Sequence, residues 1–225
     1  MRFRASANVL IGASALFVAL VTTSAIAWRA SRSTIDAGFW WDAAAPFLLS
    51  QGDAIKIGGP LTADELTRIQ RVSRGEVEHA YKDLRITVSD HRRAFWRVSV
   101  VGEPITVNRN RTTYPFSMAG ESHVFGPLGG FGSVGFQILA HNAIEYAPAG
   151  AARAEIVDGI GRGIGRAAVH EFAHQALGTD NLSHIDGRSD GQSYEYRSAD
   201  RPAQYYGDLR WTTAWPVLNE KFGRR

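Results

Sequence analysis

Apolar residues recur with helical spacing in two long stretches of the chain. In the first, Thr62 followed by Glu65 three positions later has the form of a capping box, and helical spacing continues to about residue 83. In the second, Gly178 stands where a helix needs a left-handed C-terminal residue. We therefore predict helices over 62–83 and 154–177. The second rests on a stripe made by Ile156, Ile160, Ile164, Val169, Phe172, Ala173, Ala176 and Leu177.

Four glycines interrupt the first half of the second helix, at positions 159, 161, 163 and 165. Each glycine inside a helix costs roughly 1 kcal/mol relative to alanine, or about 4 kcal/mol for all four. Either the helix begins late, near Gly165, or its first half is pressed against a sheet where only hydrogen fits. The four-residue recurrence of isoleucine favours a helix that begins near Ala154.

Alternating apolar and polar residues predict two strands, at 84–89 and 95–101, joined by a turn at 90–93. A third strand is expected at 133–139, after glycine-rich residues 126–132, whereas 102–125 look irregular. Short helices are expected at 193–200, ended by Pro202, and at 211–222. The predicted class is α+β: a small, mostly antiparallel or mixed sheet packed on helices, with a helical C-terminal tail.

The N-terminus has the features of a targeting segment. Arg2 and Arg4 precede an apolar run, and Ala25-Ile26-Ala27 supplies a cleavage site, which favours a secretory signal. The run over 8–28 is also long enough to serve as an uncleaved membrane tether. Both interpretations place the rest of the chain outside the cytoplasm, whether secreted, periplasmic or membrane-anchored.

Length and composition predict one domain. Of the 225 residues, we assign 1–27 to the signal or anchor, 28–60 to a linker and aromatic-rich lead-in, and 61–225 to the domain. Without the first 27 residues, 23 basic residues face 22 acidic ones, so nothing indicates a nucleic-acid partner. The sequence has no cysteine, which excludes disulfides, thiolate metal ligands and a cysteine nucleophile. It gives no oligomeric state.

The sequence H-E-F-A-H occupies positions 170–174, inside the second predicted helix. Two histidines four residues apart lie on the same helical face, so His170 and His174 can reach one ion. Glu171 is rotated by about 100° from His170, so its carboxylate can address a water on that ion without ligating it. This arrangement is typical of a zinc hydrolase.

The motif resembles the active-site helix of the zincin metallopeptidases. The resemblance implies a zincin-like fold, zinc bound by His170 and His174, Glu171 as general base, and a peptide or protein substrate lying along the strand at 133–139. Three protein ligands are usual for catalytic zinc. The metzincin pattern is damaged, because the glycine has slipped to Gly178 and no methionine follows Met118, although Asp180 stands at the ligand position.

Gluzincins take a glutamate about twenty residues further on, and Glu195 lies 21 residues after His174, with Asp200 following. Glu195 is therefore the preferred third ligand, ahead of His184 and Asp180. In this interpretation zinc polarises both water and the scissile carbonyl, and Glu171 carries the proton to the leaving amine. Candidate oxyanion donors are His184, if it is not a ligand, and Tyr194, Tyr196, Tyr205 and Tyr206.

Two other roles stay open. Arg162 and Arg166 precede His170 on roughly its face, where they bind a substrate carboxylate or, more simply, form structural salt bridges. A non-catalytic secreted or tethered domain that binds a partner or a structural metal is the alternative function. Glu171 discriminates between the functions, because a purely structural site needs no acid beside its ligands.

Overall fold

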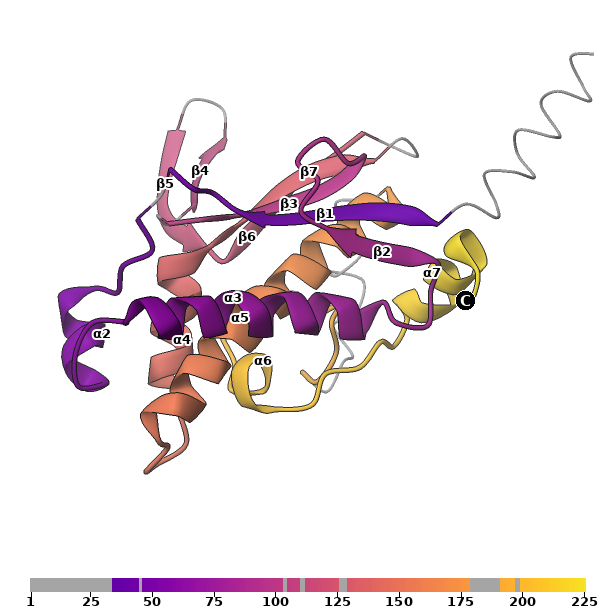
Figure 1. Cartoon of the computed structure of the whole chain (residues 1–225). Helices are drawn as coiled ribbons and strands as arrows, with labels where there is room; N and C mark the ends of the chain where they lie inside the picture. The colour runs from indigo at the N-terminus through magenta and orange to yellow at the C-terminus, as the bar shows by residue number, and fades with distance from the viewer. Residues whose placement is uncertain are drawn as a thin grey trace, which may run out of the picture.

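A five-stranded mixed sheet forms one layer of the computed structural model, which describes residues 34–44, 46–102, 105–109, 112–125, 129–178, 191–196 and 199–225 (Figure 1). The strand order is β2-β1-β3-β7-β6; the first four strands run parallel, and β6 is the antiparallel edge strand. The strands are β1 (Ile35–Trp41), β2 (Ile86–Ser89), β3 (Trp96–Val101), β6 (Gly120–Val124) and β7 (Gly130–Gly135). A separate hairpin pairs β4 (Ile105–Arg109) with β5 (Thr112–Met118).

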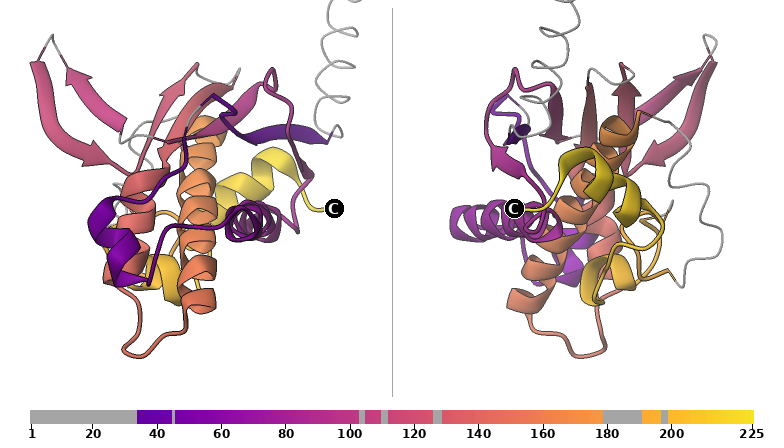
Figure 2. Two further views of the ribbon diagram at one scale, coloured as in Figure 1. Left: turned by 60° about the vertical axis from the view of Figure 1, so that its left-hand side comes forward. Right: turned by 90° about the vertical axis from the view of Figure 1, so that its right-hand side faces the viewer.

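The helices gather on one face of the sheet, here called the inner face, and leave the other, outer face without a helix in the described part of the chain (Figures 1 and 2). The central helix α5 contacts β3, β6 and β7 and packs along α3. The helices are α2 (Gln51–Lys56), α3 (Ala63–Ala80), α4 (Phe136–Glu145), α5 (Arg153–Leu177), α6 (Ala203–Tyr206) and α7 (Ala214–Phe222). The core between the layers includes Phe39, Val98, Leu139, Ile160 and Ile164, each nearly or fully buried.

The structure confirms the α+β class but corrects the sheet. The strands predicted at 84–89 and 95–101 do not form a hairpin, because β1 lies between them and all three run parallel. Alternation specifies which side chains face the core and says nothing of which strand pairs with which. The lead-in over 28–60 is also wrong as a linker, since it contains β1 and α2.

Two further segments differ from expectation. The strand predicted at 133–139 ends at Gly135, and α4 begins at Phe136, because Phe136, Leu139, Ala140 and Ala143 bury one face with helical spacing. Residues 102–125, expected to be irregular, contain β4, β5 and β6. In the tail, the residues described within 193–200 form no helix, and Pro202 precedes α6 rather than ending a helix.

The two long helices were predicted correctly to within a few residues. α3 begins after Thr62, whose side chain and that of Glu65 form the expected capping box. α5 ends at Gly178, whose φ of 69° gives the left-handed C-cap. No helix in the described ranges is long and apolar enough to cross a membrane, and the predicted segment at 8–28 lies outside those ranges.

The glycines of α5 allow close helix packing, but their neighbours are not the sheet. A Cβ on Gly165 would lie 2.4 Å from the Ser73 carbonyl oxygen of α3, and one on Gly161 would lie 2.7 Å from the Val72 Cβ. Gly159 and Gly163 face tyrosine rings of α6. The glycines therefore let α3 and α6 approach the motif helix more closely than any side chain would permit.

Replacing Gly165 with alanine should destabilise the fold by about 2 kcal/mol, because the new methyl group meets backbone that cannot move away. Gly75 on α3 is the matched control, since a Cβ there meets nothing within 4 Å. Gly75→Ala should stabilise the fold by about 0.5–1 kcal/mol. Urea unfolding of both variants measures the difference, and equal gains in stability would contradict the packing argument.

An ion pair holds the start of α5 to the start of α3. Arg153 Nε lies 2.6 Å from Glu65 Oε1, and this hydrogen bond is the main reason that the pKa of Glu65 falls to about 2. A carboxyl whose folded-state pKa is lowered stabilises the fold above its unfolded pKa, and that stabilisation is lost as the pH falls toward 2.

We expect Glu65→Gln to lose about 1–2 kcal/mol at pH 7, and the deficit to vanish as the pH falls from about 4.5 to 2. Glutamine also serves in a capping box, so the substitution isolates the charge. Unfolding free energies measured across that pH range test the prediction. A deficit that stays constant down to pH 2 would assign the effect to the cap.

Candidate metal centre

The two motif histidines converge near the C-terminal end of α5. His170 Nε2 and His174 Nε2 are 3.2 Å apart, with the imidazole rings edge to face. Two nitrogens bound to one tetrahedral zinc at 2.0–2.1 Å would be separated by about 3.3 Å. The sequence placed both residues on one helical face, and the structure brings the same nitrogen of each ring to a separation close to the one that zinc requires.

A backbone carbonyl sets the tautomer of His170. Its Nδ1 lies 2.8 Å from the Tyr194 carbonyl oxygen. Since a carbonyl only accepts, Nδ1 carries the proton in the neutral ring and Nε2 keeps its lone pair. Metal-binding histidines are commonly oriented in this way. The Tyr194 carbonyl is thus a functional group that the sequence motif does not reveal.

Glu171 points toward the edge strand β6. A Cβ built on Gly120 would lie 2.5 Å from Glu171 Oε1, so only glycine leaves room for the carboxylate. The Glu171 side chain is buried, and Ser122 Oγ donates to the Glu171 backbone carbonyl at 3.0 Å. Burial is the main reason that the pKa of the Glu171 carboxyl rises to about 8. A carboxyl with this pKa holds a proton at neutral pH, and a nearby cation such as zinc would lower its pKa and favour the carboxylate that a general base needs.

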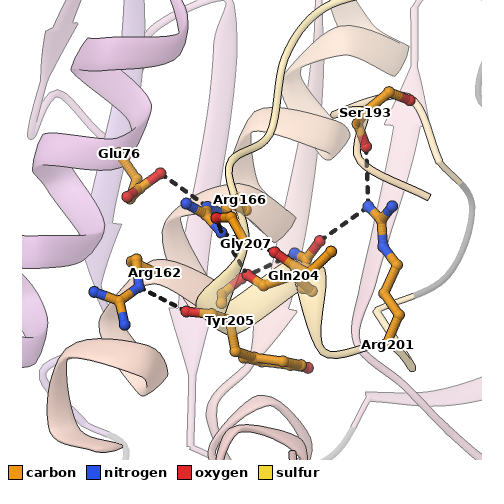
Figure 3. Close-up of polar contacts among 10 residues, drawn as sticks. Glu76, Arg162, Arg166, Ser193, Arg201, Gln204, Tyr205 and Gly207 are labelled. Atoms are coloured by element: carbon orange, nitrogen blue, oxygen red, sulfur yellow. Dashed lines mark hydrogen bonds and ion pairs between the residues drawn. The ribbon is translucent and has the colours of Figure 1, made fainter. Parts of the chain in front are cut away.

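Arg166, one turn before His170, fixes the segment that follows the motif. Its guanidinium is buried, lies 2.9 Å from a Glu76 carboxylate oxygen on α3, and donates to three carbonyls at the ends of α6 (Figure 3). The carbonyls belong to Ala203, Gln204 and Gly207. The structural salt bridge expected of this arginine is therefore confirmed. Arg162, also considered as a carboxylate binder, donates to the Tyr205 carbonyl oxygen at 2.6 Å.

The same network extends to the carbonyl that orients His170. Gln204 Nε2 donates to the Gly163 carbonyl oxygen of α5 at 3.3 Å. Arg201 reaches both the Gln204 side chain and the Ser193 carbonyl oxygen, the latter at 2.9 Å (Figure 3). Ser193 immediately precedes Tyr194. The contacts thus tie the Tyr194 backbone to the helix that carries the histidines.

Gln175 anchors the motif helix to the sheet and was not singled out from the sequence. Its side chain is fully buried; Oε1 accepts from the Arg97 backbone N–H at 2.9 Å, and Nε2 donates to the Arg97 carbonyl oxygen at 3.0 Å. A Cβ on Gly130 would lie 2.6 Å from the Gln175 side chain, so the glycines of β7 make the space. The only signal in the sequence was the position of this amide, between Ala173 and Ala176 of the apolar stripe.

The structure does not bring Glu195 to the histidine pair. Its carboxylate is buried, and Oε1 accepts from the backbone N–H groups of Thr212 and Ala214, at 2.7 and 2.9 Å, which caps the start of α7. Among the described residues, Glu195 is not part of any group of three side chains whose possible ligand atoms all lie within 4.8 Å of one another. The other two candidate ligands, Asp180 and His184, lie outside the described residues.

The remaining candidates have structural partners. Asp200 accepts a hydrogen bond from the hydroxyl of Tyr146, the residue that follows α4, rather than supporting a ligand. The Tyr205 and Tyr206 hydroxyls donate to the carbonyls of Ala199 and Ala143. The Tyr194 ring packs against Trp211, and the Tyr196 ring lies under the Arg201 guanidinium. The geometry therefore supports packing for the four tyrosines proposed as oxyanion donors.

Asp53, His141 and Glu145 do have possible ligand atoms within 4.8 Å of one another, at a different place in the fold. These three side chains already have protein partners. Asp53 accepts from Ser50 Oγ at 2.6 Å and contacts His141 Nδ1 at 2.9 Å, and Glu145 pairs with Lys56. These contacts join α2 to α4 and account for the cluster.

The chain was compared with known proteins. No model of a protein family and no curated protein matches it. The functional assignment therefore rests on the geometry of the site.

Proposed function

We propose that this protein is a zinc-dependent peptidase of zincin type, in which His170 and His174 hold the ion and Glu171 is the general base. The observation that carries the proposal is the convergence of the two Nε2 atoms at 3.2 Å, on a helix that also presents a buried carboxylate. Glu195 Oε1 is bound to the start of α7, and Glu195 does not form a group with His170 and His174 in which all three ligand atoms lie within 4.8 Å of one another. We therefore propose a third ligand within 179–190, with His184 ahead of Asp180.

The protein residues have separate tasks in this mechanism. When bound, zinc lowers the pKa of water and polarises a carbonyl group. Glu171 takes the proton from the attacking water and delivers it to the leaving amine nitrogen. Burial of Glu171 favours the protonated form of its carboxyl, the form that carries the proton between the two transfers. The Tyr194 carbonyl keeps the His170 ring in the orientation that presents Nε2.

The substrate strand proposed from the sequence has to be reassigned. The strand at 133–139 was expected to be the edge along which a peptide lies, but β7 lies between β3 and β6. The edge strand next to β7 is β6, and Glu171 lies against the first residue of β6, Gly120. An edge strand offers backbone N–H and C=O groups to an extended chain. We propose that the peptide or protein substrate pairs with β6 outside the cytoplasm.

Metal removal tests the proposed function. We expect the full chain to hydrolyse an unfolded protein such as casein, to lose more than about 99% of that activity after chelation, and to regain it with one equivalent of zinc. Release of amino groups measures the reaction. Activity that survives complete removal of metal, with residual zinc checked by mass spectrometry, would exclude a zinc peptidase.

A further inference from the structure

Three exposed phenylalanines lie at one end of the sheet. Phe95 precedes β3, Phe125 follows β6, and Phe131 lies at the start of β7; their exposed fractions are 72%, 53% and 37%. The rings of Phe125 and Phe131 are 5.6 Å apart, and the Gly130 N–H donates to the Phe95 carbonyl oxygen. Exposed aromatic clusters of this kind mark interaction surfaces more often than isolated exposed rings do.

The register places this cluster on the outer face. Phe131 alternates with Gly130 and Gly132, which face Gln175 of α5, so the Phe131 ring points away from the helices. Its partners in register are Arg97 and His123; the His123 ring stacks on Phe131 at 4.5 Å, and the Arg97 guanidinium lies 5.7 Å from the ring centre. The surface thus combines aromatic rings with cationic groups.

Further cations border the aromatic rings. The connection from β2 to β3 crosses the outer face over Gly38, where a Cβ would lie 2.2 Å from the His91 carbonyl oxygen, and it carries exposed Arg92 and Arg93. The neighbouring carboxylates of Asp36 and Glu121 face histidines, at 3.0 and 4.0 Å. Asp90 is also exposed in the connection. With Arg97, three arginines lie beside three carboxylates on the surface around Phe95, and two of those carboxylates face histidines.

The start of β1 puts the N-terminal segment at the same end. β1 is parallel to β3 and β7, so Ile35 lies at the end of the sheet where those strands begin (Figure 1). Only residues 29–34 separate Ile35 from the apolar run that ends at Trp28. Such a connection spans at most about 25 Å. Whatever binds the apolar run therefore comes close to the phenylalanines.

We propose that Phe95, Phe125 and Phe131, bordered by Arg92, Arg93 and Arg97, form a docking surface for a phospholipid bilayer. Aromatic side chains favour the interfacial region of a bilayer, where arginine side chains pair with lipid phosphate groups. The N-terminal apolar run supplies one attachment and this surface a second, which orients the domain with the outer face of its sheet toward the lipid. The inference does not depend on the peptidase activity.

The absence of cysteine allows a site-specific test on the full chain. An environment-sensitive fluorophore is attached to a Phe95→Cys variant and, as a matched control, to an Ile55→Cys variant. Ile55 is 71% exposed and lies on α2, at the opposite end of the molecule from the start of β1 (Figure 1). Both proteins are reconstituted in phosphatidylcholine vesicles, with or without 30% phosphatidylserine, that contain brominated lipid as a quencher.

With phosphatidylserine present, the fluorophore at position 95 should be quenched at least twofold and that at position 55 unaffected. Arg92→Glu combined with Arg93→Glu should reverse most of the quenching at position 95, with unchanged circular dichroism. Equal quenching at the two positions would overturn the proposal, as would a fluorophore at position 95 that stays in water. A spectral shift at position 95 that depends on protein concentration and needs no lipid would instead assign the surface to a second copy of the chain.

Discussion

Glu171→Gln should lower the rate of peptide hydrolysis by about 10²–10⁴-fold, while zinc binding should stay within a factor of a few. The amide has nearly the shape of the carboxylate and fits the same space against Gly120, but it cannot accept a proton. Removing a buried carboxyl whose pKa is raised should also stabilise the metal-free protein, by an amount that grows as the pH rises from about 4.5 and is complete above about pH 8. We therefore expect an inactive variant that is still folded.

Glu145→Gln is the matched control, because it removes a carboxylate on α4 that takes no part in the proposed site. Initial rates on casein and thermal unfolding, measured at equal zinc occupancy, separate catalysis from stability. If Glu171→Gln kept more than a tenth of the activity, another group would have to be the base. The non-catalytic alternative predicts no hydrolysis by the wild-type chain.

His174→Ala should weaken zinc binding by more than about 100-fold and should remove the proposed activity with it. Removal of a ligand should exceed the 10–100-fold effect typical of losing a group that merely orients one. Competition against a zinc chelator measures the affinity. His141→Ala serves as the control, since His141 belongs to the group formed with Asp53 and Glu145. Equal losses for the two variants would show that the ion does not bind where the Nε2 atoms converge.

The third ligand follows from the same titration. With the Glu195 carboxylate bound to the start of α7, Glu195→Gln should keep zinc affinity within a factor of a few, because an amide oxygen still accepts from Thr212 and Ala214. His184→Ala should weaken zinc binding as strongly as His174→Ala. The opposite ranking would restore the gluzincin-like assignment of Glu195.

Local patterns explain what could be predicted from the sequence. The capping box at Thr62, the left-handed Gly178 and the isoleucine stripe between them each depend on residues close in the chain, and both long helices have nearly the expected bounds. The same is true of His170 and His174, because helical geometry alone puts both on one face.

What the sequence did not reveal depends on contacts distant in the chain. β1 pairs with two strands that come 45 or more residues later, and no local pattern selects those partners. In the sequence, Glu195 resembles an exposed carboxylate on a helix. In the fold it is buried and accepts hydrogen bonds from the start of α7, about 17 to 19 residues later. Gln175 and Arg166 are polar residues within a helix, and only the backbone that surrounds them gives them a role.

The central claim is that one zinc ion binds between His170 and His174. Crystals of the zinc-loaded full chain, measured on both sides of the zinc absorption edge, locate the ion directly by anomalous scattering. We predict one strong peak 2.0–2.1 Å from both Nε2 atoms, with the Glu171 carboxylate outside its ligands. A peak at Asp53, His141 and Glu145 instead, or none at the motif histidines, would contradict the account.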